Sequence, residues 1–401
     1  MRQAEGTMTK TEDLVIVGLG AVGSATLYQS AKRGARVIGI DRFQPPHNQG
    51  SSHGDTRITR QAIGEGRDFV PLVLRSNQIW EELESATGCS LLTRNGGLIL
   101  ASPTIASSHH GSTSFLQDTI DAAVGFGIAH QKLSAADIRQ WYPQFRLKGD
   151  EVGYFESGAG FLRPEACIEA QLSAAKNYGA TVVTGETVLA FQALADGTIK
   201  VNTNRENYSA AKVLLAVGPW IQRLLGPEHA SLFKVYRQVM NWFALAQHAE
   251  RYSTDCFPVF IWITGPRPRD MLYGFPTVDS PESGVKISTE QYESAVDPNG
   301  VTRTVARSEV AAMYAEYIAP RLPDVSSQCL RSEVCLYTVT PDAKFVVDWA
   351  PSFTSILLAS ACSGHGFKHS AALGEALAQL ALGEKPVIDL TPFRLLRFAT
   401  G

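Results

Sequence analysis

The stretch SSHGDTRITR, residues 51–60, has side chains that could bind an anion. It contains a histidine, an aspartate and two arginines, Arg57 and Arg60. A planar guanidinium can hold a carboxylate through two parallel hydrogen bonds, which fixes the orientation of the anion as well as its position. The composition of this stretch therefore indicates anion binding. A solvated or ion-paired loop is the alternative.

The segment that precedes this stretch has the pattern of a dinucleotide-binding unit. LVIV is a short apolar run, typical of a buried parallel strand. Gly18, Gly20 and Gly23 follow in G-x-G-x-x-G spacing, and a helix is expected from about residue 21 to 32. A second strand, ARVIGI, runs up to Asp41. These features predict a βαβ unit that binds a dinucleotide; the alternative is an apolar βαβ unit with incidental glycines.

Each of these residues would have a physical role in that unit. Gly18 permits the tight turn, Gly20 lets the backbone approach a pyrophosphate, and Gly23 lets helix and strand pack closely. The pyrophosphate would lie at the helix N-terminus, where free N–H groups and the helix dipole favour negative charge. Asp41 would accept hydrogen bonds from an unphosphorylated ribose, either of NAD or of the adenosine half of FAD.

The composition of the 401 residues is that of a globular protein, 44% hydrophobic and 19% charged, with a net charge of -3. We expect neither nucleic acid nor a membrane as partner, because there is no basic excess and no apolar run of the roughly 20 residues that span a bilayer. None of the six cysteines is in a C-x-x-C pair or beside a histidine at ligand spacing, so we expect no metal site. The polar residues 1–10 predict a flexible tail rather than a signal peptide, and the cytoplasm as location.

Strand and helix patterns recur along the whole chain. EACIEAQLSAAKNYGATVV repeats the helix–glycine–strand rhythm, and TSILLASACSGHGFKHSAALGEALAQLAL indicates a strand, a glycine-rich turn and a helix. Because nucleotide-domain features occur near the start, the middle and the end, we predict an α/β fold of two interleaved domains. The expected nucleotide-binding domain takes residues 11–95, 165–235 and 328–395, and the expected substrate domain, a mixed sheet, takes residues 96–164 and 236–327.

Four motifs together resemble one known family. SHGDTRITR and GEGRDFVPL occur near the start of the chain, and CLYTVTPD and SGHGFK near its end. In this order, over about residues 13–392, the chain resembles the family of monomeric sarcosine oxidase and N-methyltryptophan oxidase, which are amine oxidases with covalently attached flavin. The resemblance implies a Rossmann-like FAD-binding domain of the glutathione-reductase and D-amino-acid-oxidase type.

The resemblance also implies which residues contact FAD. The family attaches the flavin to a cysteine in a C-x-Y-T stretch, which is Cys335 here; a buried free thiol is the alternative. Attachment requires a thiolate, and His53 or Arg57 could lower the pKa of the thiol. The residues implied to contact the cofactor are Gly18, Gly20, Gly23, Asp41, Arg57, Val188, Cys335, Gly364, His365, Gly366, Phe367 and Lys368.

The catalytic residues follow from the same resemblance. Arg57 is implied to lie close to the flavin, with His53 nearby, while Arg60 and Lys368 grip the carboxylate of the substrate. Lys286, in SGVKIS, is implied to lie over the flavin ring and to activate oxygen, because a cation lowers the cost of forming superoxide. A snorkelling surface lysine is the alternative for Lys286.

The sequence departs from the family at Glu290. Sarcosine-specific members have a histidine at this position, four residues after Lys286. A carboxylate there could raise the pKa of a bound amine, or pair with a cationic group on a larger substrate. The alternative is that Glu290 points to solvent. Tyr273 is implied to face the same cavity, with Tyr337 as a second candidate, and both are equally consistent with core positions.

The implied reaction is oxidation of a secondary amino acid at a C–N bond to an imine that water hydrolyses, with O2 reduced to hydrogen peroxide. We expect a monomer that takes a small amino acid and O2. Three alternatives are open at this point: an oxidase of cyclic imino acids such as pipecolate or proline, a flavin dehydrogenase with another electron acceptor, and an NAD-binding protein or non-catalytic flavin module.

Overall fold

The computed structural model describes residues 11–104 and 109–398, so the expected tail at residues 1–10 lies outside the described residues. The described chain begins with the βαβ unit, in which strand β1 spans Glu12–Val17, helix α1 spans Ala21–Lys32 and strand β2 spans Val37–Asp41. The unit therefore has the predicted bounds. Its two strands are parallel and mostly buried, as expected where helices cover a parallel sheet.

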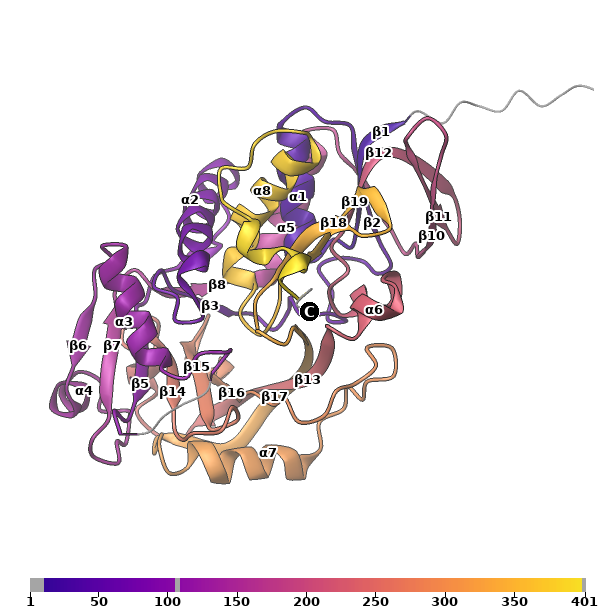
Figure 1. Cartoon of the computed structure of the whole chain (residues 1–401). Helices are drawn as coiled ribbons and strands as arrows, with labels where there is room; N and C mark the ends of the chain where they lie inside the picture. The colour runs from indigo at the N-terminus through magenta and orange to yellow at the C-terminus, as the bar shows by residue number, and fades with distance from the viewer. Residues whose placement is uncertain (1–10, 105–108, 399–401) are drawn as a thin grey trace, which may run out of the picture.

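This unit lies inside the first of three sheets in the described part of the chain. The strand order is β10-β11-β12-β1-β2-β9, with β19 beside β12 and β18 beside β19 (Figure 1). The strands from β19 through β12, β1 and β2 to β9 are parallel, whereas β10, β11 and β18 add antiparallel pairs. The added strands are β9 (Thr181–Thr184), β10 (Val188–Ala193), β11 (Ile199–Thr203), β12 (Asn207–Leu215), β18 (Val346–Ala350) and β19 (Phe353–Ser360).

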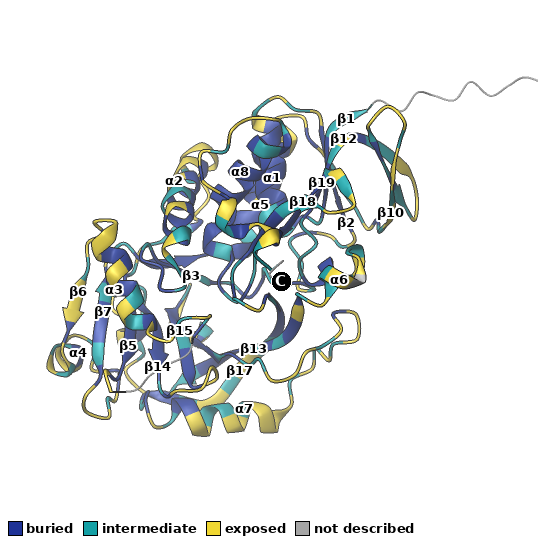
Figure 2. Ribbon diagram, viewed as in Figure 1, coloured by how far each residue is buried: buried dark blue, intermediate teal, exposed yellow. Residues whose placement is uncertain are grey.

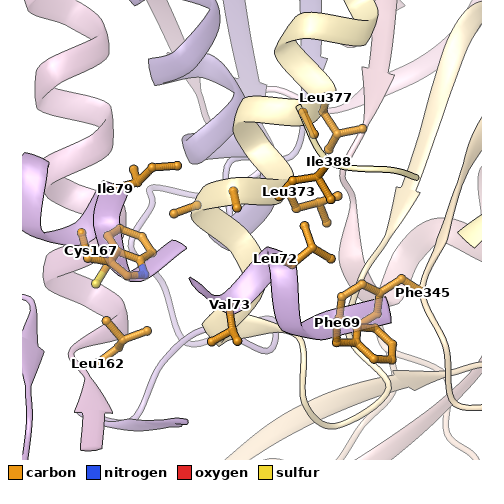
Figure 3. Close-up of a cluster of buried hydrophobic side chains, with 14 of the residues drawn as sticks. Phe69, Leu72, Val73, Ile79, Leu162, Cys167, Phe345, Leu373, Leu377 and Ile388 are labelled. Atoms are coloured by element: carbon orange, nitrogen blue, oxygen red, sulfur yellow. The ribbon is translucent and has the colours of Figure 1, made fainter. Parts of the chain in front are cut away.

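Helices α1, α2, α5 and α8 pack together beside this sheet (Figure 1). α2 spans Val70–Thr87, α5 spans Pro164–Asn177 and α8 spans Ser370–Ala381. A Cβ atom on Gly374 would lie 2.4 Å from that of Ala25, so the glycine lets α8 approach α1 closely. Figure 3 shows part of the core between these helices, to which α2 contributes Leu72, Val73 and Ile79 and α8 contributes Leu373 and Leu377.

A second, mixed sheet forms the other large layer. Its order is β17-β13-β16-β15-β14-β5-β7-β6, and β17 pairs with β13 over almost the whole length of the latter (Figure 1). Its strands are β5 (Gly97–Ala101), β6 (Gln131–Leu133), β7 (Val152–Glu156), β13 (Lys234–Leu245), β14 (Val259–Ile263), β15 (Met271–Thr277), β16 (Val285–Thr289) and β17 (Val325–Val339). The helices associated with it are α3 (Phe115–Gly125), α4 (Ala135–Trp141) and α7 (Arg307–Met313).

A small third sheet lies between the two large layers (Figure 1). Strand β3, Arg57–Thr59, pairs antiparallel with β8, Gly160–Leu162, and β8 also pairs with β4, Leu92–Thr93. This sheet fixes the position of the anion-binding stretch, because Arg57 is directly opposite Leu162. Figure 2 shows that the strands of the large sheets are largely buried, whereas α7 and β6 carry exposed residues.

Short helical turns complete the described chain. The segment after β12 forms a seven-residue 3-10 helix, Gly218–Leu224, and Gly226 and Pro227 interrupt the chain soon afterwards. The other turns are Arg67–Phe69, α6 (Pro227–Ala230), Ala249–Tyr252, Pro281–Ser283, the π-helical turn Tyr314–Ile318, Phe367–His369, Thr391–Phe393 and Leu395–Phe398.

Two long strands of the second sheet cross the expected domain boundaries. β13 begins at Lys234, before the boundary at 236, and β17 begins at Val325, before the boundary at 328. The domain boundaries themselves stay a prediction. Over the described ranges, the chain contains no helix long and apolar enough to cross a membrane.

Candidate active site

A cavity of about 370 Å³ lies where strands of the first sheet end. It borders the residues that follow β1, β2, β12 and β19, which is the edge where parallel sheets bind nucleotides. Four of the residues predicted to contact a dinucleotide line it: Gly18, Gly20, Asp41 and Val188. The predicted segments are therefore brought together at the expected edge of the sheet.

The three glycines have the environments that their expected roles require. Gly18 has a φ of 90°, which favours glycine. A Cβ atom on Gly23 would lie 1.8 Å from the carbonyl oxygen of Gly18, so this glycine allows helix and strand to touch. At Gly20, the nearest atom to an added Cβ is the Ser52 Oγ at 4.0 Å. The space in front of Gly20 thus belongs to the cavity, and a ligand can come close to the backbone there.

Asp41 is held as an acceptor at the wall of this cavity. Its Oδ2 accepts a hydrogen bond from the Leu19 N–H at 2.7 Å, and its Oδ1 accepts one from the Phe43 N–H at 2.7 Å. Each carboxylate oxygen has more than one lone pair, so both can still accept from hydroxyl groups. Helix α1 begins next to it without a side-chain cap, which leaves N–H groups free for an anion.

A second cavity, of about 110 Å³, adjoins the first and shares Ser51, Ser52 and Cys362 with it. It brings together most of the residues predicted for catalysis, from β3, β15, β16, β17 and the turn before α8. Those that line it are Arg57, Arg60, Tyr273, Lys286, Glu290, Tyr337, Gly364, His365, Gly366, Phe367 and Lys368. Arg60 and Lys368, for example, are more than 300 residues apart in sequence and line the same cavity.

Arg60 and Lys368 meet on one carboxylate, that of Glu65. The Arg60 Nη2 forms an ion pair with Glu65, and the Lys368 Nζ lies 3.7 Å from the Glu65 Oε1. The Lys368 Nζ also donates to the His365 carbonyl at 2.8 Å. Burial lowers the pKa of Lys368 to about 8, against the opposing effect of Glu65. Burial alone would raise the pKa of Glu65, but the two cations hold it well below its usual value. The cluster is therefore a preformed carboxylate site.

Lys286 is buried under the loop that contains the first arginine. Its Nζ donates to the Gly54 carbonyl at 2.6 Å and to the Thr56 carbonyl at 2.9 Å. Burial, and then the nearby Arg57, lower the pKa of Lys286 well below its usual value. The Arg57 guanidinium donates in turn to the carbonyls of Thr56 and Ser51, at 2.8 and 2.7 Å. Backbone carbonyls thus accept hydrogen bonds from both basic side chains.

Glu165, at the start of α5, holds the backbone of this loop. Its Oε1 accepts the Gly54 N–H at 2.5 Å and the Asp55 N–H at 3.3 Å. The carbonyls of Gly54 and Thr56 that bind Lys286 belong to the same segment. The N-terminal turn of α5 therefore positions Lys286 through two backbone groups.

Cys335 lies on β17 opposite Gln238 and is 1% exposed, but it lines neither cavity. It packs in a small cluster with Tyr337 and Cys362, which do line the second cavity. Burial raises the pKa of the Cys335 thiol to about 11, and Arg57 reduces this effect only in part. Burial at this position therefore favours the neutral thiol over the thiolate that covalent attachment requires.

His53 lines neither cavity. Its Nδ1 lies 3.2 Å from the Glu333 Oε2, and burial lowers the pKa of the imidazole. Its contact with Glu333 directs the ring toward β17. Of the two residues expected to act on Cys335, Arg57 is the one that lowers the pKa of its thiol.

Glu290 does not point to solvent: its side chain is 4% exposed and lines the second cavity. Its Oε2 accepts from the Tyr292 hydroxyl at 2.5 Å and lies 3.3 Å from the Nε2 of His110. Burial opposes its ionisation, but His110, His109 and Tyr292 outweigh burial and lower the pKa of Glu290 to about 2. This acidic residue is therefore ionised at neutral pH.

Several residues of the site were not predicted from the sequence. Glu65 lies in the motif GEGRDF, five residues after Arg60. An acidic residue so close in sequence to Arg60 could have indicated an ion pair at the site. The adjacent His109 and His110 were a second signal, because paired histidines are uncommon and both side chains prove to be buried. Tyr292 and Glu165 had no local signal, since only the tertiary fold brings them to their partners.

Comparison with known proteins agrees with this geometry. A family model described as FAD dependent oxidoreductase matches residues 13–380. The monomeric sarcosine oxidase of Streptomyces avermitilis is 35% identical over 94% of this chain and 94% of its own length. The N-methyl-L-tryptophan oxidase of Salmonella agona is 34% identical over 96% of this chain and 99% of its own. The structure of NikD, an unusual amino acid oxidase essential for nikkomycin biosynthesis, is 25% identical with a TM-score of 0.82, and the match covers 96% of this chain and 98% of that one.

Gly20→Ala should separate cofactor binding from folding. The added methyl meets no protein atom closer than 4.0 Å, so we expect a thermal midpoint within a few degrees of the native one. It would occupy the space through which the dinucleotide approaches the backbone, so we expect at least about a tenfold loss of cofactor affinity. Titration of FAD into apoprotein measures the affinity, and both variants also carry Cys335→Ser so that a covalent link cannot hold the cofactor. Thermal unfolding of the apoprotein measures the second effect.

The matched control for this prediction is Gly300→Ala, which also meets no atom within 4 Å and lies outside both cavities. It should keep both the cofactor and the native midpoint. An unchanged Kd for FAD in Gly20→Ala would contradict the assignment of this cavity.

Proposed function

Because the chain belongs to the FAD-dependent oxidoreductase family that includes monomeric sarcosine oxidase and N-methyl-L-tryptophan oxidase, we propose that it oxidises a secondary amino acid at a C–N bond. In this reaction one O2 and one water are consumed, and the products are a primary amine, a carbonyl compound and hydrogen peroxide. The observation that carries the proposal is the meeting of Arg60 and Lys368 with Lys286 around one cavity next to the dinucleotide site.

The residues of the first cavity fit FAD. The space in front of Gly20 and the uncapped start of α1 suit a pyrophosphate, and the oriented carboxylate of Asp41 suits a ribose. When bound, FAD supplies the two-electron acceptor for the C–H bond next to the substrate nitrogen. The protein supplies geometry and charge around it.

Arg60 and Lys368 would bind the substrate carboxylate. Both already hold the carboxylate of Glu65, so the site has the geometry and charge for this group. An incoming carboxylate would share these cations with Glu65 or displace it. Holding the carboxylate fixes the amine and its neighbouring C–H bond in one orientation. The entropy cost of aligning the reacting groups is then met on binding, before the reaction begins.

Lys286 would assist the reduction of oxygen. Its Nζ is anchored by the carbonyls of Gly54 and Thr56, which favour a protonated amine. Burial opposes that charge, and any negative charge that develops in the cavity during turnover would favour it. A cation held here would stabilise the reduction of O2 to superoxide, the first step toward peroxide.

We also propose that the flavin is attached covalently to Cys335. Supporting this is its place on β17 beside Tyr337 and Cys362, next to the second cavity, with Arg57 as the cation that lowers the pKa of its thiol.

The six cysteines are free thiols, in keeping with our further proposal that the enzyme acts in the cytoplasm. We propose that it acts as a monomer, as the name of the Streptomyces relative states for that protein.

The proposed function is tested by peroxide release from the purified protein with sarcosine, N-methyltryptophan, pipecolate and proline. We expect peroxide with an N-methyl amino acid. Arg60→Lys keeps the charge but loses the bidentate hydrogen bonds to a carboxylate. We therefore expect kcat/KM to fall about tenfold to a hundredfold, mainly through a rise in KM. Arg139→Lys, on the exposed face of α4, should match the native enzyme.

The outcomes of this panel distinguish the alternatives. Peroxide with pipecolate or proline alone would identify an oxidase of cyclic imino acids. Reduction of an artificial dye by the same substrates without peroxide would identify a dehydrogenase. A coloured protein that none of the substrates bleaches without oxygen would contradict the proposal.

The pKa of Lys368, about 8, predicts a pH dependence of carboxylate binding. The side chain is cationic below this pH and neutral above it. We therefore expect the Kd of a carboxylic acid inhibitor without an amine to rise as the pH increases through about 8, by up to about tenfold per pH unit. Titrations followed by the flavin absorbance measure this. Lys368→Met should bind the inhibitor more weakly, with a Kd that does not change with pH. Lys132→Met, on β6, should keep the native dependence of Kd on pH. A Kd of the native protein that does not change with pH would refute the assignment.

Cys335→Ser tests the covalent link. After acid precipitation we expect the native protein to keep its flavin in the pellet and the variant to release it into the supernatant, because a serine hydroxyl is not ionised near neutral pH. Cys329→Ser, on the same strand and outside both cavities, should behave as the native protein. Release of flavin from the native protein would exclude covalent attachment.

A further inference from the structure

Glu290 presents one free carboxylate oxygen to the second cavity. Its Oε2 is engaged by the Tyr292 hydroxyl and by His110. Its Oε1 has no hydrogen-bond partner among the described residues, although the side chain is only 4% exposed. Two contacts on one oxygen hold the carboxylate in place, and the other oxygen is left as an acceptor.

The cations of the cavity are engaged elsewhere. Arg60 and Lys368 both lie on Glu65, and Lys286 lies on the backbone carbonyls of residues 54 and 56. No lysine or arginine of the described chain is within salt-bridge distance of Glu290, and the Nε2 of His110 lies 3.3 Å from it. An ionised carboxylate oxygen that faces a largely buried cavity is a strong acceptor, because water competes poorly for it.

The surroundings of Glu290 form a second pole of the cavity. The ring of His110 lies 5.2 Å from that of His365 and 6.2 Å from that of Tyr292, centroid to centroid. The ring of His109 lies against His110 at 4.0 Å, and its Nδ1 is buried without a hydrogen-bond partner in the described residues. The cavity thus has a cationic pole at Arg60 and an anionic, imidazole-rich pole at Glu290.

We propose that Glu290, oriented by Tyr292 and His110, is a subsite for a positively charged group on the side chain of the substrate. The preferred substrate is then a secondary amino acid that bears a basic side chain. This inference rests on the proposed function. The cavity of about 110 Å³ restricts the side chain to a short one.

The reacting amine itself is a poorer occupant of this subsite. An ionised carboxylate favours the protonated form of an adjacent amine. A protonated amine has no free lone pair to assist loss of hydride from the neighbouring carbon, so contact with Glu290 would oppose the reaction. A cation on the side chain can bind there without affecting the reacting nitrogen.

A divalent metal ion is also a poorer occupant. His109, His110 and Glu290 could each offer one ligand atom, all within 4.8 Å of one another. However, Arg60 and Lys368 face the same cavity, and their charge opposes a divalent cation. The Tyr292 hydroxyl also already occupies one of the two carboxylate oxygens.

The test compares two substrates of equal shape, α-N-methyl-diaminobutyrate and α-N-methyl-norvaline, in which a methyl group replaces the side-chain ammonium. Kd is measured from the flavin absorbance with oxygen excluded, and kcat/KM from peroxide release. A charge-assisted hydrogen bond predicts that the native enzyme prefers the basic substrate by about tenfold or more in both quantities. Glu290→Gln keeps the shape and removes the charge, so the preference should fall close to one.

Glu293→Gln is the matched control, because Glu293 is exposed, lies three residues further along and pairs with Arg269 at the surface. It should keep the native preference. Equal affinity of the native enzyme for both substrates would overturn the inference, as would a preference that Glu290→Gln leaves intact. An equal loss for both substrates in Glu290→Gln would also overturn it, by placing the reacting amine at this carboxylate.

Two further outcomes keep the inference separate from the proposed function. Peroxide from neither substrate, nor from the four amino acids of the panel above, would reject the oxidase function, whereas the ratio of the two Kd values would still test the subsite. Tight binding of one Zn²⁺ per chain by the holoenzyme, lost in Glu290→Gln, would overturn the inference in favour of a metal site.

Discussion

Four basic side chains face one largely buried cavity, and removing a charge from water is costly unless partners replace the lost hydration. In this protein the partners are of two kinds. Arg57 and Lys286 donate hydrogen bonds to backbone carbonyls of the loop at residues 51–56. Arg60 and Lys368 instead pair with the carboxylate of Glu65. The first pair is held by the main chain, and the second pair by the carboxylate of another residue. The proposed binding of a substrate carboxylate would therefore compete with an anion that the protein already supplies.

This division of charge explains the positions of the supporting elements. The loop must keep its carbonyls pointed at Lys286, and Glu165 at the start of α5 secures it from the other side. Strand β3 continues from the loop and is paired with β8, which fixes the backbone of Arg57 opposite Leu162. The third sheet is small, and it lies between the two large layers (Figure 1). Its short strands thus hold the loop between the sheet that borders the first cavity and the sheet that bears Lys286.

The parts of the site that were predictable from sequence are those with a local signature or a family motif. The βαβ unit has the predicted bounds because its glycines and Asp41 constrain a continuous segment. Arg60, Lys286 and Lys368 do line one cavity, as the motifs implied. The environments of Cys335 and Glu290 could not be predicted, because they depend on burial and on partners brought from distant segments. The hydrogen bond between Tyr292 and Glu290 depends on tertiary packing, and the 3-10 turn that begins at Gly218 depends on the interruption of the chain after it. Hydrophobic periodicity reveals neither feature.

The order of strands in the first sheet also governs how the protein can be made. β1 near the start pairs with β12, and β12 pairs with β19, whose end at Ser360 continues into the lining of the dinucleotide cavity. These pairings join residues separated by about 200 and then about 140 positions, so the contact order is high and folding is expected to be slow. On the ribosome, β12 presents an unpaired edge until the last tenth of the chain emerges. The lining of the dinucleotide cavity is therefore complete only once β19 has paired with β12, so we expect FAD binding to follow late in folding.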